Sequence, residues 1–125
     1  FKESLFKIYI NMVYNVLEND LDEYYKIIMT KDYSDKLIIV YFTAKWCGPC
    51  KMVSPIVQRI GEEKDSVVVL KVDVDDCSDI SDNCEIDCMP TFLFYKENNI
   101  EPVERFSGAD VNVLVQNITN HLSQK

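Results

Sequence analysis

The sequence predicts a layered α/β domain in which a central mixed β-sheet is flanked by α-helices in the order βαβαβαββα. Two apolar runs rich in β-branched residues, at positions 37–42 and 67–72, indicate buried strands. Each run is followed by a segment with helical spacing, as in parallel crossover units. Two further apolar runs, at 91–95 and 103–106, lie close together in the chain and predict an antiparallel hairpin at the end of the sheet.

The first part of the chain predicts a strand, a helix and a second strand. Residues 13–17 are predicted to form a short strand, and Asn19 or Asp20 can cap the helix that follows. Residues 32–36 are predicted as a polar loop that leads into the central strand at 37–42. The apolar positions of the predicted helix recur at intervals of three and four residues: Leu21, Tyr24, Tyr25 and Ile28.

The middle of the chain predicts a second helix, a buried strand and a short helix. The second helix has its apolar stripe from near Lys51 to near Gly61, and the strand at 67–72 leads to a short helix at 78–83. In sheets of this kind the ligand site lies at the carboxyl ends of the strands, where residues 46–50 fall. The stripe consists of Met52, Val53, Ile56, Val57 and Ile60.

The end of the chain predicts the hairpin and a terminal helix. Residues 96–101 separate the two hairpin strands, and Asn98 and Asn99 supply the turn. An amphipathic helix follows Asp110. His121 lies near its end and is expected to be solvated. The apolar stripe of this helix is Val111, Leu114, Val115, Ile118 and Leu122.

Length and composition predict one globular domain without nucleic-acid or membrane partners. A chain of 125 residues buries enough surface for a single core. Apolar residues make up 47% of it, yet no stretch approaches the roughly 20 apolar residues that a membrane span needs. The formal charge is −8, from 13 basic and 21 acidic residues, and no basic stripe is present that could neutralise phosphates.

The segment Trp46-Cys47-Gly48-Pro49-Cys50 is predicted to be a redox centre. At the start of a helix, the first sulfur of a Cys-x-x-Cys lies near free backbone N–H groups and the positive end of the dipole, which favour the thiolate. The second sulfur lies one turn further on, within disulfide reach. Pro49 suits a first-turn position, and Gly48 leaves the approach to sulfur open.

Other interpretations of a bare Cys-x-x-Cys are half of a zinc site or two buried thiols. Both are disfavoured because strand, Trp46, Gly-Pro and helix agree, and because no second Cys-x-x-Cys follows. A redox-sensing binding module, in which the fold docks a partner, is an alternative from a different functional class.

Four segments together resemble the thioredoxin family, in its eukaryotic form. They are residues 44–52 (AKWCGPCKM) with Pro55, residues 72–77 (VDVDDC), residues 88–92 (CMPTF) and residues 106–109 (FSGA). The likeness covers about residues 12–125 and implies the thioredoxin fold. Residues 1–11 are expected to lie outside this core, as an upstream extension, a processed remnant or an artefact.

The resemblance implies a protein-disulfide reductase, an electron-transport protein that contributes to cell redox homeostasis. Cys47 is expected to be an exposed nucleophile that attacks a client disulfide, and Cys50, recessed by one turn, to resolve the mixed disulfide. Implied partners are client proteins such as peroxiredoxins or reductases, and a thioredoxin reductase as electron donor. No cofactor or metal is implied. The alternative within redox chemistry is an oxidase or isomerase of a secretory or organellar compartment.

The resemblance also implies a client-binding face. By this likeness the Met89–Pro90 bond is cis and faces the two sulfurs, and Asp75 accepts a hydrogen bond from the Trp46 indole. The cis bond leaves the backbone of Met89 free to pair with an extended client. The expected face comprises Trp46, Gly48, Pro49, Met89, Pro90, Gly108 and Ala109.

One position departs from the family pattern. Many thioredoxins carry a buried Asp on the central strand beneath the active site, and this chain has Tyr41 there. Lys71 matches a position where some members carry a lysine partnered with that acid. An ordinary phenol is a poor base at neutral pH. Resolution is therefore expected to be slower, or to depend on Lys71 and water.

Five cysteines cannot all pair within one molecule. If Cys47 and Cys50 form the couple, three remain, an odd set that fits a reducing, cytoplasmic compartment. Cys77 and Cys84 are interpreted as small core or surface residues. Cys88, beside Met89, is expected to be exposed and is a candidate for an oxidised homodimer formed through the active-site face.

Overall fold

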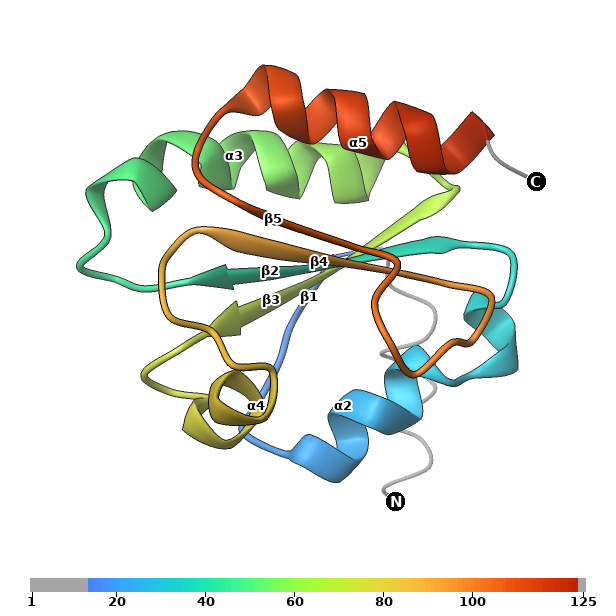
Figure 1. Ribbon diagram of the computed structural model, residues 1–125, viewed down its shortest axis with the longest axis horizontal. Helices are drawn as coiled ribbons and strands as arrows, with labels where there is room; N and C mark the ends of the chain where they lie inside the picture. The colour runs from blue at the N-terminus through green and yellow to red at the C-terminus, as the bar shows by residue number, and fades with distance from the viewer. Residues whose placement is uncertain (1–13, 124–125) are drawn as a thin grey trace.

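Five strands form one mixed sheet in the order β1-β3-β2-β4-β5 in this computed structural model, which describes residues 14–123 (Figure 1). β1, β3 and β2 run parallel, whereas β4 pairs antiparallel with both β2 and β5. The predicted mixed sheet with a terminal hairpin is confirmed. The strands are β1 (Tyr14–Val16), β2 (Leu37–Thr43), β3 (Val67–Asp73), β4 (Thr91–Lys96) and β5 (Glu104–Ser107).

Helices cover both faces of the sheet. α3 and α5 lie on one face, and α2 and α4 lie on the other (Figure 1). Asp20 caps α2 by accepting a hydrogen bond from the backbone N–H of Glu23 at 3.0 Å. The helices are α2 (Leu21–Ile28), α3 (Gly48–Glu63), α4 (Ser78–Asn83) and α5 (Val111–Ser123).

The central strand β2 is buried along its whole length, because both of its faces are covered. Successive side chains point to opposite faces. Ile38 and Phe42 therefore pack toward α2 and α4, while Ile39 and Tyr41 pack toward α3 and α5. A strand held on both faces gives the segment that follows it a rigid base.

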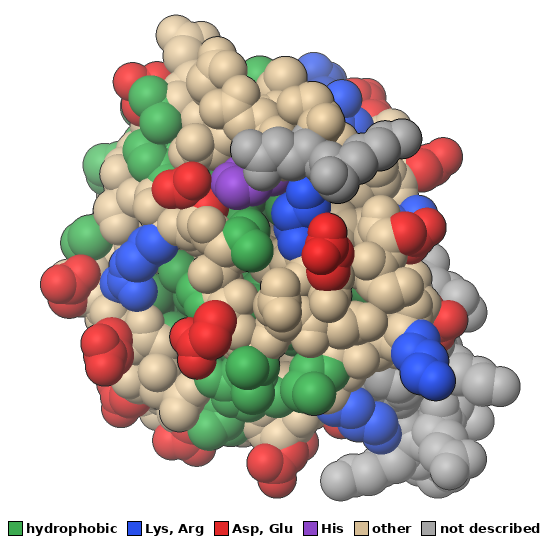
Figure 2. Space-filling view, turned by 45° about the vertical axis from the view of Figure 1, so that its right-hand side comes forward, with side chains coloured by type: hydrophobic (Ala, Val, Ile, Leu, Met, Phe, Trp, Pro, Cys, Tyr) green, Lys and Arg blue, Asp and Glu red, His purple; other side chains and the backbone are tan. Residues whose placement is uncertain are grey.

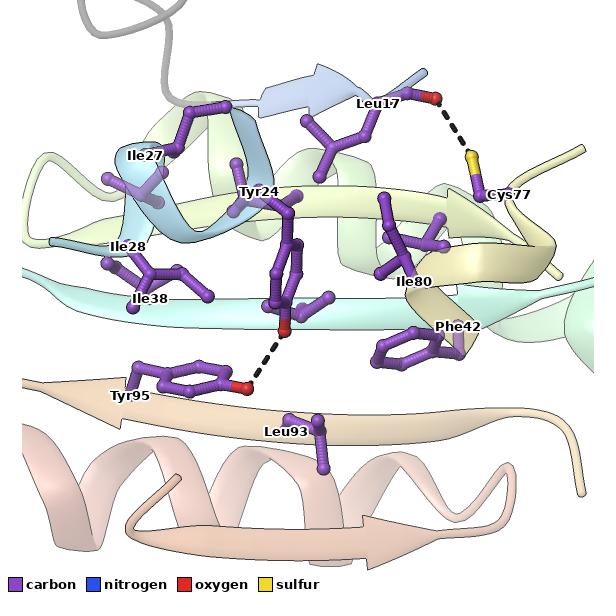
Figure 3. Close-up of a cluster of buried hydrophobic side chains, with 14 of the residues drawn as sticks. Leu17, Tyr24, Ile27, Ile28, Ile38, Phe42, Cys77, Ile80, Leu93 and Tyr95 are labelled. Carbon is purple, nitrogen blue, oxygen red and sulfur yellow. Dashed lines mark hydrogen bonds between the residues drawn. The ribbon is translucent and has the colours of Figure 1, made fainter. Parts of the chain in front are cut away.

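The core on the α2 and α4 face contains polar groups that are paired (Figure 3). The hydroxyls of Tyr24 and Tyr95 lie 2.9 Å apart, and the Cys77 thiol donates to the Leu17 carbonyl at 3.3 Å. Burial raises the pKa of Tyr24 and of Tyr95. Cys77 is fully buried, so of its two interpretations, a small core residue or a small surface residue, the structure supports the first.

Two local expectations were wrong. Part of the predicted polar loop at 32–36 lies in a 3-10 helix, η1 (Lys31–Tyr33), and the ring of Tyr33 is buried in the core on the α2 and α4 face. His121 is not solvated: its side chain is only 11% exposed, it stacks on Phe94, and its Nε2 lies 3.3 Å from Glu104 Oε1. Sequence spacing placed His121 on the helix but did not show that the hairpin packs against this part of α5.

Some boundaries also moved by a residue. β5 begins at Glu104 instead of 103, although the Val103 N–H still donates to the Phe94 carbonyl at 2.7 Å. In the hairpin turn the left-handed residues are Glu97 and Asn98, with φ values of 57° and 56°. Asn98 also donates its side-chain amide to the Thr30 carbonyl at 2.8 Å, which ties the turn to the end of α2.

The predicted start of β1 at position 13 and the expected extension at residues 1–11 lie outside the described residues. Within residues 14–123, no helix is both long enough and apolar enough to cross a membrane. On the face that Figure 2 shows, acidic and basic side chains are interspersed and no broad basic area is visible.

Candidate active site

The two cysteines of the motif lie where β2 passes into α3. Cys47 is the N-cap of α3, its Sγ accepts the backbone N–H of Cys50 at 3.1 Å, and Pro49 occupies the first turn. The two residues form a disulfide, with their Cα atoms 5.3 Å apart. The first sulfur therefore receives a backbone N–H at the positive end of a 16-residue helix, the environment that favours a thiolate after reduction.

The two cysteines differ little in exposure. Cys47 is 4% exposed and Cys50 is 1% exposed in the disulfide form, so the expectation of an exposed nucleophile beside a recessed resolver is wrong for this state. Met89 packs against the buried cluster that Ala44, Cys47 and Cys50 form. Around it, the approach over Gly48 is open, because an added Cβ there would meet no atom within 4 Å.

Trp46 stands beside the disulfide and is held from the neighbouring loop. Trp46 is 67% exposed, and its Nε1 donates to Asp75 Oδ2 at 2.9 Å, which confirms the contact expected for Asp75. The turn that carries Asp75 is fixed by Asp73, whose Oδ1 accepts the backbone N–H groups of Asp75 and Asp76 at 2.9 and 3.1 Å. The orientation of an exposed indole thus depends on a turn at the end of β3.

The Met89–Pro90 peptide bond is cis, as expected. The Pro90 carbonyl accepts the Gly108 N–H at 2.9 Å, which brings the segment before β4 next to the segment after β5. Gly108 has a φ of 121°, a conformation that other residues rarely adopt. Ala109 follows and is half-buried.

Residues 15–120 match the Thioredoxin family model. The chain belongs to the thioredoxin family. The thioredoxin of Ictalurus punctatus is 50% identical over 93 residues, which cover 73% of this chain and 85% of the relative. With the disulfide at the start of α3, this membership makes the protein a thiol-disulfide oxidoreductase that reduces protein disulfides.

Solved thioredoxins share the fold. The X-ray structure of Fasciola hepatica thioredoxin superposes with a TM-score of 0.77 at 36% identity, over 86% of this chain and 98% of that chain. A chain solved in work on the thiol resolving mechanism in yeast mitochondrial 1-Cys peroxiredoxin via glutathione/thioredoxin systems has a TM-score of 0.74 at 28% identity, over 90% of this chain and 97% of that chain.

Tyr41, the position that departs from the thioredoxin pattern, lies in the core between the sheet and α3. The ring is fully buried and stacks on Phe92. The hydroxyl lies 3.2 Å from the Cys50 carbonyl and 2.5 Å from the Ser54 hydroxyl. Because the carbonyl can only accept, we assign the phenol proton to it and the Ser54 proton to the phenol oxygen. Tyr41 therefore contacts the backbone of Cys50.

A cavity of about 440 Å³ is lined in part by Cys50 and by Lys71. Lys71 pairs with Tyr41 across the sheet, so both residues point toward α3. Sequence reasoning missed two other residues of this cavity, Ser54 and Asp73. Spacing could have indicated both, because Ser54 lies one helical turn after Cys50 and Asp73 lies two residues after Lys71 on one strand.

The three other cysteines occupy different environments. Cys88 is exposed, as expected, and its Sγ lies 3.7 Å from Thr91 Oγ1. Cys84 is half-buried, and its thiol donates to the Tyr24 hydroxyl at 3.6 Å. Burial raises the pKa of Cys84 and of Cys77, so both thiols ionise less readily than a free cysteine.

Proposed function

We propose that the protein is a cytoplasmic electron carrier in which Cys47 is the nucleophile and Cys50 is the resolving thiol. The observation that carries the proposal is the Cys47–Cys50 disulfide at the N-terminus of α3, beside the cis Met89–Pro90 bond. Its electrons come from a thioredoxin reductase. The odd set of three further cysteines supports a reducing compartment.

The cycle transfers two electrons without a cofactor. The Cys47 thiolate attacks one sulfur of a client disulfide, which forms a mixed disulfide and releases the other client sulfur as a thiolate that takes up a proton. Cys50 then loses its proton and attacks Cys47, which forms the intramolecular disulfide and releases the second client thiol. The reductase returns two electrons and two protons to the pair.

The direction of attack follows from the helix. The Sγ of Cys47 already accepts a backbone N–H at the N-cap, whereas Cys50 lies inside the first turn. A negative charge is better stabilised at the first position. The Tyr41 hydroxyl already bonds to Ser54 and to the Cys50 carbonyl. The Cys50 proton therefore leaves through the cavity that Lys71 and Asp73 line.

Clients are proposed to dock on the face around the disulfide. Trp46 supplies exposed apolar area, and Met89 packs against the cluster that contains both cysteines. The free backbone of Met89 suits pairing with an extended client segment. Peroxiredoxins are the client class that we favour, because a chain of the same fold was solved in work on peroxiredoxin thiol resolution. The docking face consists of Trp46, Gly48, Pro49, Met89, Pro90, Gly108 and Ala109.

Two serine variants test the roles of the cysteines. We expect Cys47→Ser to abolish reduction of insulin disulfides, and Cys50→Ser to attack but accumulate mixed disulfides. Mass spectrometry of the trapped adducts identifies the clients. Equal accumulation of adducts on both variants would contradict the assigned order. A fully active Cys47→Ser protein would indicate a binding module instead.

The reduction potential separates a reductase from an oxidase. We expect equilibration with glutathione to give a value of roughly −270 mV, for which thioredoxin itself is the reference example. A potential of about −180 mV would favour the isomerase alternative, and one of about −120 mV the oxidase alternative.

An oxidised homodimer through Cys88 is part of the proposal. Cys88 is exposed and adjoins Met89, so two copies related by a two-fold axis can meet sulfur to sulfur. Such a dimer would cover the disulfide and stay inactive until reduced. Non-reducing electrophoresis after mild peroxide treatment should show a dimer band in the wild type and none in Cys88→Ser. A band that persists would assign the bond to another cysteine.

A further inference from the structure

The segment between α4 and β4, residues 84–90, ends in the part of the docking face formed by Met89 and Pro90. It begins with a helix stop in which Glu85 is left-handed, with a φ of 55°. The N–H of Glu85 donates to the Asp82 carbonyl at 3.1 Å, and the N–H of Ile86 donates to the Ser81 carbonyl at 3.0 Å. This is the Schellman pattern, and it attaches the start of the segment to α4.

Arg105 of β5 also holds the start of this segment. Its Nη1 donates to the Cys84 carbonyl at 3.0 Å, and its Nη2 donates to the Glu85 carbonyl at 2.8 Å. The planar guanidinium is suited to span two neighbouring acceptors, and a charged donor makes each bond stronger than a neutral one. Because Arg105 belongs to β5, these two bonds tie the start of the segment to the sheet.

The end of the segment is held from the same strand. Thr91 donates its hydroxyl to the Cys88 carbonyl at 2.8 Å, and the Ser107 hydroxyl lies 2.8 Å from that of Thr91. Directly after β5, the Gly108 N–H donates to the Pro90 carbonyl at 2.9 Å. One short strand and the residue after it therefore hold both ends of the segment that carries Met89.

We propose that Arg105 is a positioning residue of the client site. By holding the carbonyls of Cys84 and Glu85, it sets residues 84–90 in a fixed position relative to Gly108. This role rests on the proposed function and deepens it, because it concerns how the docking face binds polypeptide clients. Arg105 does not touch the sulfurs.

The proposal separates large substrates from small ones. A protein client pairs with the backbone near Met89. If residues 84–90 are held loosely, they must become ordered when the client docks, and this costs conformational entropy. The cost lowers the rate constant for productive docking. A small disulfide such as cystine needs access to Cys47 only. Loss of the Arg105 bonds should therefore lower the rate with proteins and leave the rate with cystine unchanged.

The experiment measures oxidation of the reduced full-length protein by insulin and by cystine after rapid mixing. We expect Arg105→Gln to lower the second-order rate constant with insulin about three- to tenfold, with the cystine rate constant and the reduction potential unchanged. Arg105→Lys, which keeps the charge but loses the fork, should fall between Arg105→Gln and wild type. Arg59→Gln is the matched control, because it removes the same charge from an exposed part of α3.

The outcomes distinguish this role from the proposed function. Equal losses with insulin and cystine in Arg105→Gln, or a loss with insulin matched by Arg59→Gln, would overturn the role of Arg105. If Arg105→Gln does not fold, an intermediate loss confined to insulin in Arg105→Lys supports the role, and no loss overturns it. A wild-type protein that leaves insulin unreduced would overturn the proposed function and this role with it.

Discussion

The hydroxyl oxygen of Tyr41 lies 2.5 Å from that of Ser54, and this contact joins the central strand to α3 one turn after Cys50. The same hydroxyl reaches the Cys50 carbonyl at 3.2 Å. In this chain a phenol, paired with the Ser54 hydroxyl, thus stands at the position where the family resemblance implies an acid. Tyr41 contacts the backbone of Cys50, the proposed resolving cysteine, without supplying a carboxylate.

Two substitutions at Tyr41 separate anchoring from proton transfer. Tyr41→Phe should lower the free energy of unfolding by about 1–2 kcal/mol, because the Ser54 hydroxyl loses its partner, and should leave the resolution rate unchanged. Tyr41→Asp should cost about 3 kcal/mol or more, because ring volume is lost and a carboxylate is desolvated. It should also speed resolution near neutral pH by taking the Cys50 proton.

Urea unfolding and rapid-mixing kinetics measure these effects. Slower resolution in Tyr41→Phe would show that the phenol itself takes part in proton transfer. An unchanged rate in the less stable Tyr41→Asp would mean that the proton leaves Cys50 by another route.

The Trp46–Asp75 hydrogen bond predicts an effect on activity without an effect on stability. Asp75→Ala should free the indole, change its fluorescence and lower the rate of insulin reduction several-fold. The free energy of unfolding should change by less than about 0.5 kcal/mol, because both residues are exposed. Asp75→Asn keeps an acceptor oxygen and is the control. Wild-type activity in Asp75→Ala would show that the orientation of Trp46 does not limit docking.

Glu85 predicts a stabilising substitution. Its φ of 55° is costly for a residue with a Cβ and free of that cost for glycine. Glu85→Gly should raise the free energy of unfolding by about 0.5–1 kcal/mol, seen as a Tm increase of about 2–4 °C by calorimetry. Glu101→Gly, at an exposed position without positive φ, should not stabilise the protein. A lower Tm for Glu85→Gly would indicate that the glutamate side chain makes a contact that matters more than its backbone.

Burial of Tyr33 predicts a loss of stability at alkaline pH. Burial raises its pKa from 10.0 to about 12. An unfolded phenol ionises near pH 10, so the stabilisation is complete below that pH and is lost as pH rises toward 12. The free energy of unfolding, measured with urea, should fall across this window. Tyr33→Phe should make the fall shallower, and an unchanged slope would show that other phenols, such as Tyr24, account for it.

Much of the fold was predictable because the hydrophobic periodicity agrees with the positions of turn and capping residues along the chain. The continuous apolar runs of β2 and β3 predict strands that are covered on both faces, and Asp20 marks the start of α2. The motif at 46–50 predicted its own local structure, because Pro49 suits the first turn of a helix. These signals are local and need no knowledge of the rest of the chain.

Tertiary structure alone decided which distant residues meet. The sequence placed Arg105 on a strand and Cys84 after a helix, but only the packing of β5 beside β4 brings the guanidinium to that carbonyl. The sequence likewise could not show that the side chain of His121 would be covered, or that both motif cysteines would be buried in the disulfide form. Periodicity reports which face of an element is apolar; which neighbour covers that face depends on how the layers close around the sheet.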